Sequence, residues 1–212
     1  MKKYRLTEET IRVGNRTLYR IQALRDFGEV KEGELGGYIE AEKNLSQCCD
    51  AWVSGNAWVS GNALVYGDAW VSDNAWVYGN ARVYGNAQVS DNAQVSGDAQ
   101  VSGNAWVSDN ARVYGNAWVS GDARVSGNAQ VSGDADIKTT GDICSMSGFG
   151  SEYRTTTAFR TKNGDVHVSC GCFFGSLEAF CQRVESTHGN NLYGREYKKM
   201  IEMLKIHFEV EP

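Results

Sequence analysis

The residues best suited to metal chemistry lie toward the C-terminus of this 212-residue chain. His167, Cys170 and Cys172 form a His-x2-Cys-x-Cys run, and imidazole and thiolate groups are the usual zinc ligands. Structural zinc sites usually pair their cysteines as Cys-x2-Cys, however, and buried free cysteines are common in protein cores. The sequence therefore predicts neither a metal site nor a cofactor, and these three residues are the candidate ligands only if a site exists.

A second group of polar residues in the same region could bind an anion. Alternation along an extended strand places His167 and Ser169 on the face opposite Val168. Arg154 and Arg160 lie in the preceding predicted strand, so the three basic residues could form a pocket for an anionic nucleotide. The competing interpretation is that Arg154, Arg160 and His167 are separate solvated side chains.

The middle of the chain, residues 51–143, repeats the hexad Ala-x-Val-Ser-Gly-Asn. Valine recurs every six residues from Val53 to Val131, Ile137 and Ile143 continue the phase, and alanine stands two residues before each valine. In an extended segment Ala and Val point to one face and x to the other, and Gly-Asn favours a turn. Each hexad is therefore a strand and a corner, and such units bury their apolar faces only by stacking into a solenoid.

The corners indicate how many hexads close one coil. Aspartate replaces the corner glycine only at Asp73, Asp91 and Asp109, which are 18 residues apart, so three hexads form a triangular coil. Residues 51–143 then make about five to six coils. The asparagines at 56, 74, 92, 110 and 128 fall in one column and predict an amide ladder. The aspartate column stacks like charges, so it must face solvent, bind a cation or lower the stability.

Aromatic side chains fill many outward slots of this coil. All six tryptophans occupy position x, and tyrosine or arginine stands at several neighbouring outward positions. Stacking Trp52 on Trp70 and Trp58 on Trp76 is one explanation, but a contiguous aromatic patch normally marks an interface. We expect residues 1–50 or another subunit to cover part of the first two coils, and partners to bind the rest. The expected binding surface comprises Trp52, Trp58, Tyr66, Trp70, Trp76, Tyr78, Tyr84, Trp106, Arg112, Tyr114 and Trp118.

The segments on either side of the repeat are ordinary globular sequence. The sequence of residues 1–50 predicts a cap with a hairpin at Gly14-Asn15. Ile39 and Leu45 already have the six-residue spacing of the repeat, but the next valine follows eight residues later, which indicates a two-residue insertion. Residues 144–212 predict a small β-β-α-α domain. Its hairpin turns at Asn163-Gly164, and its first helix starts at Ser176 and ends at Gly189.

The motif V-S-G-N-A-x over residues 51–143 resembles the hexapeptide repeat of left-handed parallel β-helix proteins. The resemblance implies a mostly β fold, a left-handed coil and the family's habit of trimeric assembly. The end stretches "TLYRIQALRDFGEVKEGELGGYIEAEKNLSQ" and "GSEYRTTTAFRT…VSCGCFFGSLEAF" resemble parts of prophage-encoded hexapeptide proteins. Many hexapeptide proteins are acyltransferases with a histidine base on the coils, but residues 51–143 contain no histidine and no insertion.

The composition of the whole chain argues against several classes of function. A formal net charge of −5 with dispersed acids argues against a nucleic-acid-binding protein. The sequence shows no signal peptide or membrane-length apolar run, which predicts a cytoplasmic protein with reduced cysteines, in the host cytoplasm if a phage encodes it. We therefore expect a non-enzymatic scaffold that forms a dimer or trimer and captures a host macromolecule, for example a protein of a defence system. The alternatives are an acyltransferase-like enzyme and a nucleotide-binding sponge.

Overall fold

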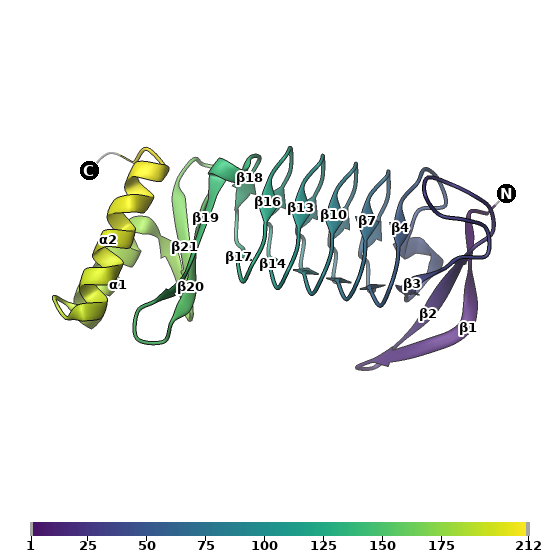
Figure 1. The fold of residues 1–212 in the computed structure, drawn as a ribbon, viewed down its shortest axis with the longest axis horizontal. Coiled ribbons are helices and arrows are strands. Elements are labelled where there is room, and N and C mark those ends of the chain that lie inside the picture. The colour runs from purple at the N-terminus through teal and green to yellow at the C-terminus, as the bar shows by residue number, and fades with distance from the viewer. Residues whose placement is uncertain (1, 211–212) are drawn as a thin grey trace.

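The protein is a rod with a different small structure at each end (Figure 1). The structure, a computed structural model, describes residues 2–210. A parallel β-solenoid of about six turns forms the rod. Antiparallel strands lie at its N-terminal end, and a β-sheet with two helices lies at its C-terminal end (Figure 1).

The solenoid has three parallel sheets, each named here by its first repeat strand. The β4 face contains β4 (Trp52–Val53), β7 (Trp70–Val71), β10 (Gln88–Val89), β13 (Trp106–Val107) and β16 (Arg124–Val125). The β5 face contains β5 (Trp58–Val59), β8 (Trp76–Val77), β11 (Gln94–Val95), β14 (Arg112–Val113) and β17 (Gln130–Val131). The β6 face contains β6 (Leu64–Val65), β9 (Arg82–Val83), β12 (Gln100–Val101), β15 (Trp118–Val119) and β18 (Asp136–Ile137).

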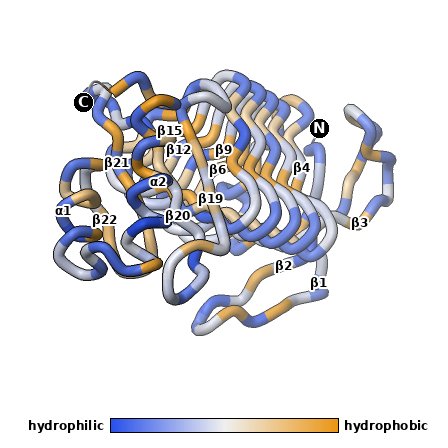
Figure 2. The backbone as a smooth tube through the Cα atoms, turned by 60° about the vertical axis from the view of Figure 1, so that its left-hand side comes forward, coloured by the Kyte–Doolittle hydropathy of each residue, from blue (hydrophilic) through white to orange (hydrophobic). Residues whose placement is uncertain are grey.

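Neighbouring strands of a face pair residues that are 18 apart, which confirms three hexads per coil. Gln88 lies opposite Trp70 on one side and Trp106 on the other, in parallel register. Backbone bonds run from coil to coil, as from the Trp58 amide to the Ala75 carbonyl at 3.0 Å. The alanine and valine of every hexad are at most 1 % exposed, so the predicted inward face is the core. Figure 2 shows apolar positions recurring from coil to coil along the rod.

The aspartate column has a structural role at its corner. Asp73, Asp91 and Asp109 adopt the left-handed conformation, with φ of 60°, 58° and 58°, which the corner glycines also adopt. Each carboxylate accepts a hydrogen bond from the next coil's backbone, from the amides of Asp91 (3.4 Å), Asp109 (3.2 Å) and Gly127 (2.9 Å). The column faces solvent, which was one of the three outcomes expected from sequence, and it also fixes the corner.

Four of the five asparagines of the predicted amide ladder are linked beside this column. The Asn56 side-chain amide donates to Asn74 at 3.3 Å, Asn74 to Asn92 at 3.4 Å, and Asn92 to Asn110 at 3.5 Å. These bonds link the same corner in successive coils, so they add to the backbone bonds that join the coils.

The N-terminal segment leads directly into the solenoid. Strands β1 (Tyr4–Val13) and β2 (Arg16–Ala23) form the predicted hairpin, and β3 (Leu35–Ile39) continues the sheet. Ile39 pairs with Val59 and Leu45 with Val65, each 20 residues on rather than 18, which confirms the two-residue insertion. A short 3-10 helix, η1 (Glu42–Asn44), forms the corner between them.

The C-terminal domain has four strands rather than the two that we predicted. Strands β19 (Ile143–Phe149), β20 (Arg154–Arg160), β21 (Val166–Cys170) and β22 (Phe173–Ser176) form one antiparallel sheet in that order. The sequences of β19 and β22 contain glycine and lack regular alternation, so their pattern does not indicate strands. Helices α1 (Leu177–His188) and α2 (Leu192–His207) pack on this sheet, and η2 (Thr140–Asp142) joins it to the solenoid.

The predicted limits of α1 are confirmed by its caps. The Ser176 hydroxyl accepts a hydrogen bond from the Ala179 amide at 3.1 Å, and Gly189 ends the helix with φ of 52°. Phe159 of β20, which is fully buried, joins the end of the solenoid core together with Ile143. The sheet thus closes the C-terminal end of the rod.

Candidate functional site

The β5 face carries the best-defined stack of outward tryptophans. Trp58 and Trp76 stack with ring centroids 5.3 Å apart and an interplanar angle of 28°. The ring centroid of Tyr78, which stands at the corner after Trp76, lies 5.8 Å from that of Trp58. Trp76 remains 40 % exposed although it packs against Trp58. We call Trp58, Trp76 and Tyr78 the aromatic ladder.

The aromatic ladder has a fixed base. Tyr38 of β3 lies opposite Trp58 in the sheet and is buried. Its hydroxyl donates to the Glu9 carboxylate at 2.9 Å, and the guanidinium of Arg20 lies 5.6 Å from its ring centroid. The Arg20 and Tyr38 hydrogen bonds hold the pKa of the Glu9 carboxyl below its usual value. The ladder therefore extends a rigid part of the cap onto the solenoid surface.

Further aromatic side chains lie on the other faces. Tyr66 and Tyr84 stack almost parallel, 4.9 Å apart, beside the β6 face. Trp118 on that face is 39 % exposed, and its indole N–H donates to Ser102 at 3.3 Å. On the β4 face, Trp106 is 41 % exposed and lies under the Arg124 guanidinium, 5.5 Å from the ring centroid.

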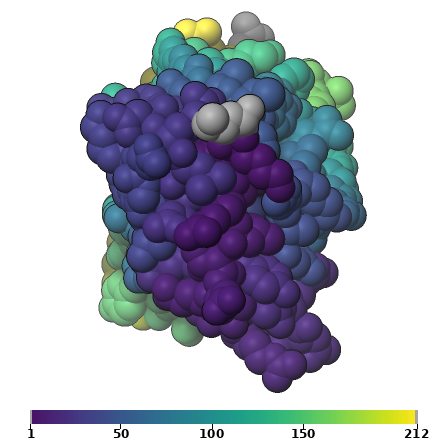
Figure 3. All heavy atoms as spheres, turned by 90° about the vertical axis from the view of Figure 1, so that its right-hand side faces the viewer, coloured from purple at the N-terminus to yellow at the C-terminus, as the bar shows by residue number. Residues whose placement is uncertain are grey.

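Trp52 is not part of an exposed surface, which corrects its place among the expected binding residues. It fills an outward slot, but it is 0 % exposed because N-terminal residues cover it. Phe27 and Tyr4 contact its ring edge to face, at 5.3 Å and 6.3 Å. Among the described residues these two rings replace the Trp52–Trp70 stack that we predicted. Figure 3 shows residues 2–50 spread over this end of the rod. This agrees with the expectation that the N-terminal segment covers part of the first coils.

The remaining expected surface residues are accessible to different degrees. Tyr114 and Arg112 are exposed, whereas Trp58, Trp70, Tyr66, Tyr78 and Tyr84 are half-buried. Gln88, Gln94 and Gln100 fill the three outward slots of one coil, with tryptophan or arginine in the paired slots on each side. The outward slots are thus arranged as the 18-residue period predicts.

The structure does not bring Arg154, Arg160 and His167 together. Arg160 lies opposite Val166, so it points to the helices, where it donates to the Phe208 carbonyl at 2.8 Å. His167 points to the other side of the sheet, beside Phe174 at 5.6 Å. Arg154 lies on the helix side six residues before Arg160, or about 20 Å along an extended strand. The anion pocket predicted from these three residues is therefore not formed.

Two of the candidate zinc ligands, His167 and Cys170, are also separated, because they lie on opposite faces of the sheet. Cys170 lies on the helix side of the sheet, where the Thr156 hydroxyl donates to its sulfur at 3.2 Å, opposite in direction to His167. Within residues 2–210 no group of three or more His, Cys, Asp or Glu side chains is placed to hold a metal ion. The six cysteines are free thiols, and burial raises the pKa of the Cys144 and Cys181 thiols.

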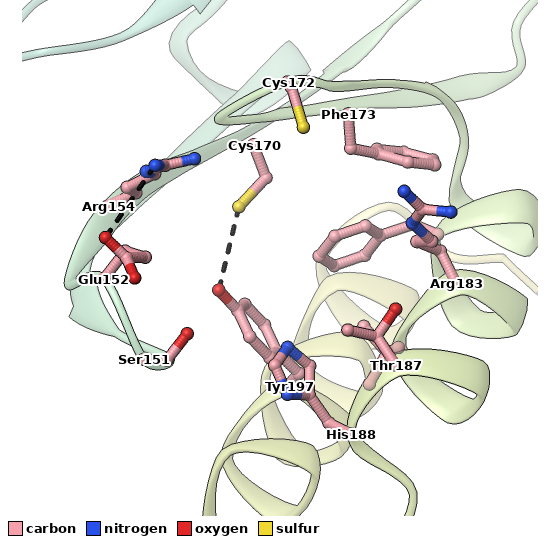
Figure 4. A pocket seen from close by; sticks show the side chains of 12 residues that line it. Ser151, Glu152, Arg154, Cys170, Cys172, Phe173, Arg183, Thr187, His188 and Tyr197 are labelled. Carbon is pink, nitrogen blue, oxygen red and sulfur yellow. Dashed lines mark hydrogen bonds and ion pairs between the residues drawn. The ribbon is translucent and has the colours of Figure 1, made fainter.

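Arg154 and Cys170 instead line a cavity of about 250 Å³ between the sheet and the helices (Figure 4). Helix α1 contributes Arg183 and His188, and α2 contributes Tyr197. None of these three residues was placed in an anion-binding pocket from the sequence. Their only signal is that Arg183 and His188 flank the apolar face of a predicted helix, and this cannot reveal which strand the helix contacts. The other lining residues are Ser151, Glu152, Cys172, Phe173, Phe180, Val184 and Thr187.

The fold defines the class of the protein as a parallel β-solenoid with globular ends. Its repeat region matches the YdcK beta solenoid repeat model, at residues 57–73, 75–91, 87–103, 93–109, 99–115, 105–121 and 117–133. No curated protein matches the chain. None of the helices in the described part of the chain is long and apolar enough to cross a membrane.

Proposed function

We propose that the chain is a non-enzymatic scaffold that binds proteins through the outward aromatic side chains of its solenoid. The observation that carries the proposal is the aromatic ladder: Trp58 and Trp76 stack on each other, yet Trp76 is still 40 % exposed. The rings are fixed by strands whose backbone bonds continue through the rod, so they cannot turn into the core.

The exposed ring area is a source of binding free energy. A tryptophan side chain presents roughly 200 Å², so a ring that is 40 % exposed leaves about 2 kcal/mol of burial available to a partner. Tryptophan, tyrosine and arginine are also the residues that dominate binding energy at protein interfaces. Arg112 lies two coils from Trp76 on the same face and is exposed. A partner bound to this face could therefore contact both tryptophan and arginine side chains.

Two kinds of protein partner fit this surface, and they can act together. A second copy of the chain would bury the aromatic ladder in a dimer or trimer, as the hexapeptide resemblance implies. The resemblance of the end segments to prophage-encoded proteins supports a bacterial host protein, such as a defence component, as the partner of the remaining surface. No histidine occurs in residues 51–143, which favours binding over acyl transfer.

The test compares assembly and capture in wild type and in a Trp58→Ser/Trp76→Ser variant. We expect the wild type to sediment as an oligomer and to retain a defined host protein. The variant should keep its circular dichroism spectrum and lose at least one of these two properties. Gln94→Ser, one coil further along the same face, is the matched control and should behave as wild type. Unchanged sedimentation and capture in the double variant would refute the proposal.

A further inference from the structure

We propose that the cavity between β20–β22 and the two helices binds a small organic anion with a phosphate or carboxylate group on a planar ring. This site lies in the C-terminal domain, away from the aromatic ladder, so it does not depend on the proposed scaffold function. Three features of the cavity carry the inference: a net positive charge, an aromatic wall and a buried hydroxyl donor (Figure 4).

The positive charge comes from two guanidinium groups that approach the cavity from opposite sides (Figure 4). Arg154 has one acidic neighbour, Glu152, at 3.8 Å, which is too long for a good hydrogen bond. Arg183 has no ion pair or side-chain hydrogen bond with any other residue in the range 2–210. A guanidinium presents several N–H donors in one plane, which matches the oxygen atoms of a carboxylate or phosphate.

The wall of the cavity is aromatic. The rings of Phe173 and Phe180 lie 5.2 Å apart, and Phe180 meets Tyr197 edge to face at 5.7 Å. His188 stacks on Tyr197 at 5.6 Å with an interplanar angle of 26°. These contacts hold the rings in place, and such a wall favours a ligand with a flat apolar part.

Tyr197 supplies a hydroxyl donor beside the two arginines. Burial raises the pKa of Tyr197 to about 12, so its hydroxyl keeps its proton at neutral pH. Its partner is the sulfur of Cys170 at 3.8 Å, and a thiol sulfur is a weak acceptor. An anion in the cavity would provide a stronger acceptor for this O–H group.

The volume limits the size of the ligand. A cavity of about 250 Å³ lies below the range of drug-sized ligand sites, which begins near 300 Å³. It therefore suits a single ring with one anionic group better than a dinucleotide. Glu152 also lines the cavity and repels anions, so we expect Arg183 to provide most of the net attraction.

Phenyl phosphate is a suitable probe because it combines a planar ring with an anionic group. Inorganic phosphate tests the anionic group alone, and phenol tests the ring alone. Titrations of the full chain are followed by amide NMR shifts. We expect saturable shifts at α1 and β21, with a Kd of about 1 mM for phenyl phosphate and weaker binding of each half. If the shifts fail to saturate by about 10 mM, or occur on the solenoid instead, the proposal is overturned.

Two charge-matched variants locate the interaction. Arg183→Gln should weaken phenyl phosphate binding by about tenfold or more, because a charge-assisted hydrogen bond is lost at an exposed side chain. Arg195→Gln removes the same charge from α2 outside this cavity and should bind as wild type. Equal affinity of Arg183→Gln and wild type, with both folded by NMR, would also overturn the proposal.

Discussion

The N-terminal cap should depend on Trp52 far more than the rod depends on an outward tryptophan elsewhere. Trp52→Ala removes roughly 200 Å² of fully buried side chain, or about 5 kcal/mol at 25 cal/mol per Å² as an upper limit. The corresponding limit for Trp118→Ala is about 3 kcal/mol, because Trp118 is already 39 % exposed and water can fill the space it leaves. We therefore expect Trp52→Ala to be more destabilising by about 2 kcal/mol.

A third variant tests the indole nitrogen of Trp52. This N–H group is buried and finds no hydrogen-bond partner among residues 2–210, a situation that costs about 1–3 kcal/mol. Trp52→Phe removes the unpaired donor and keeps contacts with Tyr4 and Phe27. We expect it to cost at least about 2 kcal/mol less than Trp52→Ala.

Urea unfolding followed by circular dichroism compares the three variants without relying on tryptophan fluorescence. Amide hydrogen exchange should show faster exchange in β1, β2 and β3 of Trp52→Ala, because solenoid ends open separately from the middle. Equal midpoints for Trp52→Ala and Trp118→Ala, with unchanged exchange in the cap, would show that the N-terminal segment does not seal Trp52.

Three further changes test other parts of the rod. Burial lowers the pKa of Lys3 from 10.5 to about 8, so the unfolded chain binds more protons between these values and stability should rise with pH there, by up to about 3 kcal/mol. Lys3→Met should abolish this rise in urea unfolding measured across that range. Asp91→Asn keeps a corner residue that tolerates the left-handed conformation and removes a charge between Asp73 and Asp109. Thermal unfolding should show a gain of about 0.5–1 kcal/mol that shrinks in high salt, and a loss would contradict the repulsion argument. Asn44→Ala removes a buried side chain that makes three hydrogen bonds to backbone groups, so chemical unfolding should show a loss of about 2–4 kcal/mol, and a change below 1 kcal/mol would contradict it.

The solenoid could be predicted from sequence because its determinants are local and repeated. In every Ala-x-Val unit the alanine and valine side chains point inward and the side chain at x points outward. The spacing of Asp73, Asp91 and Asp109 gives the number of residues in one coil. A register error in any hexad would turn its valine to water, so the pattern permits one arrangement. The burial of Trp52 was harder to predict, because it depends on Tyr4 and Phe27, which the chain brings back from far away in sequence.

The arginine placement failed for a different reason. A two-residue turn at Asn163-Gly164 would place Arg160 opposite His167, as the expected anion pocket required. The observed register pairs Arg160 with Val166, one residue away, and a shift of one residue moves a side chain to the other face. The cavity around Arg183 further requires the docking of two helices on the sheet, which apolar periodicity alone does not specify.

Because every hexad has the same length and each coil contains three hexads, the number of hexads determines how the two ends of the rod are placed relative to each other. Removal of three consecutive hexads should shorten the distance between the N-terminal cap and the C-terminal domain by one strand spacing, about 4.8 Å, and keep their relative rotation. Removal of a single hexad should instead rotate one end against the other by about a third of a turn. The number of hexads therefore sets both how far apart the two ends are held and the direction in which each one faces.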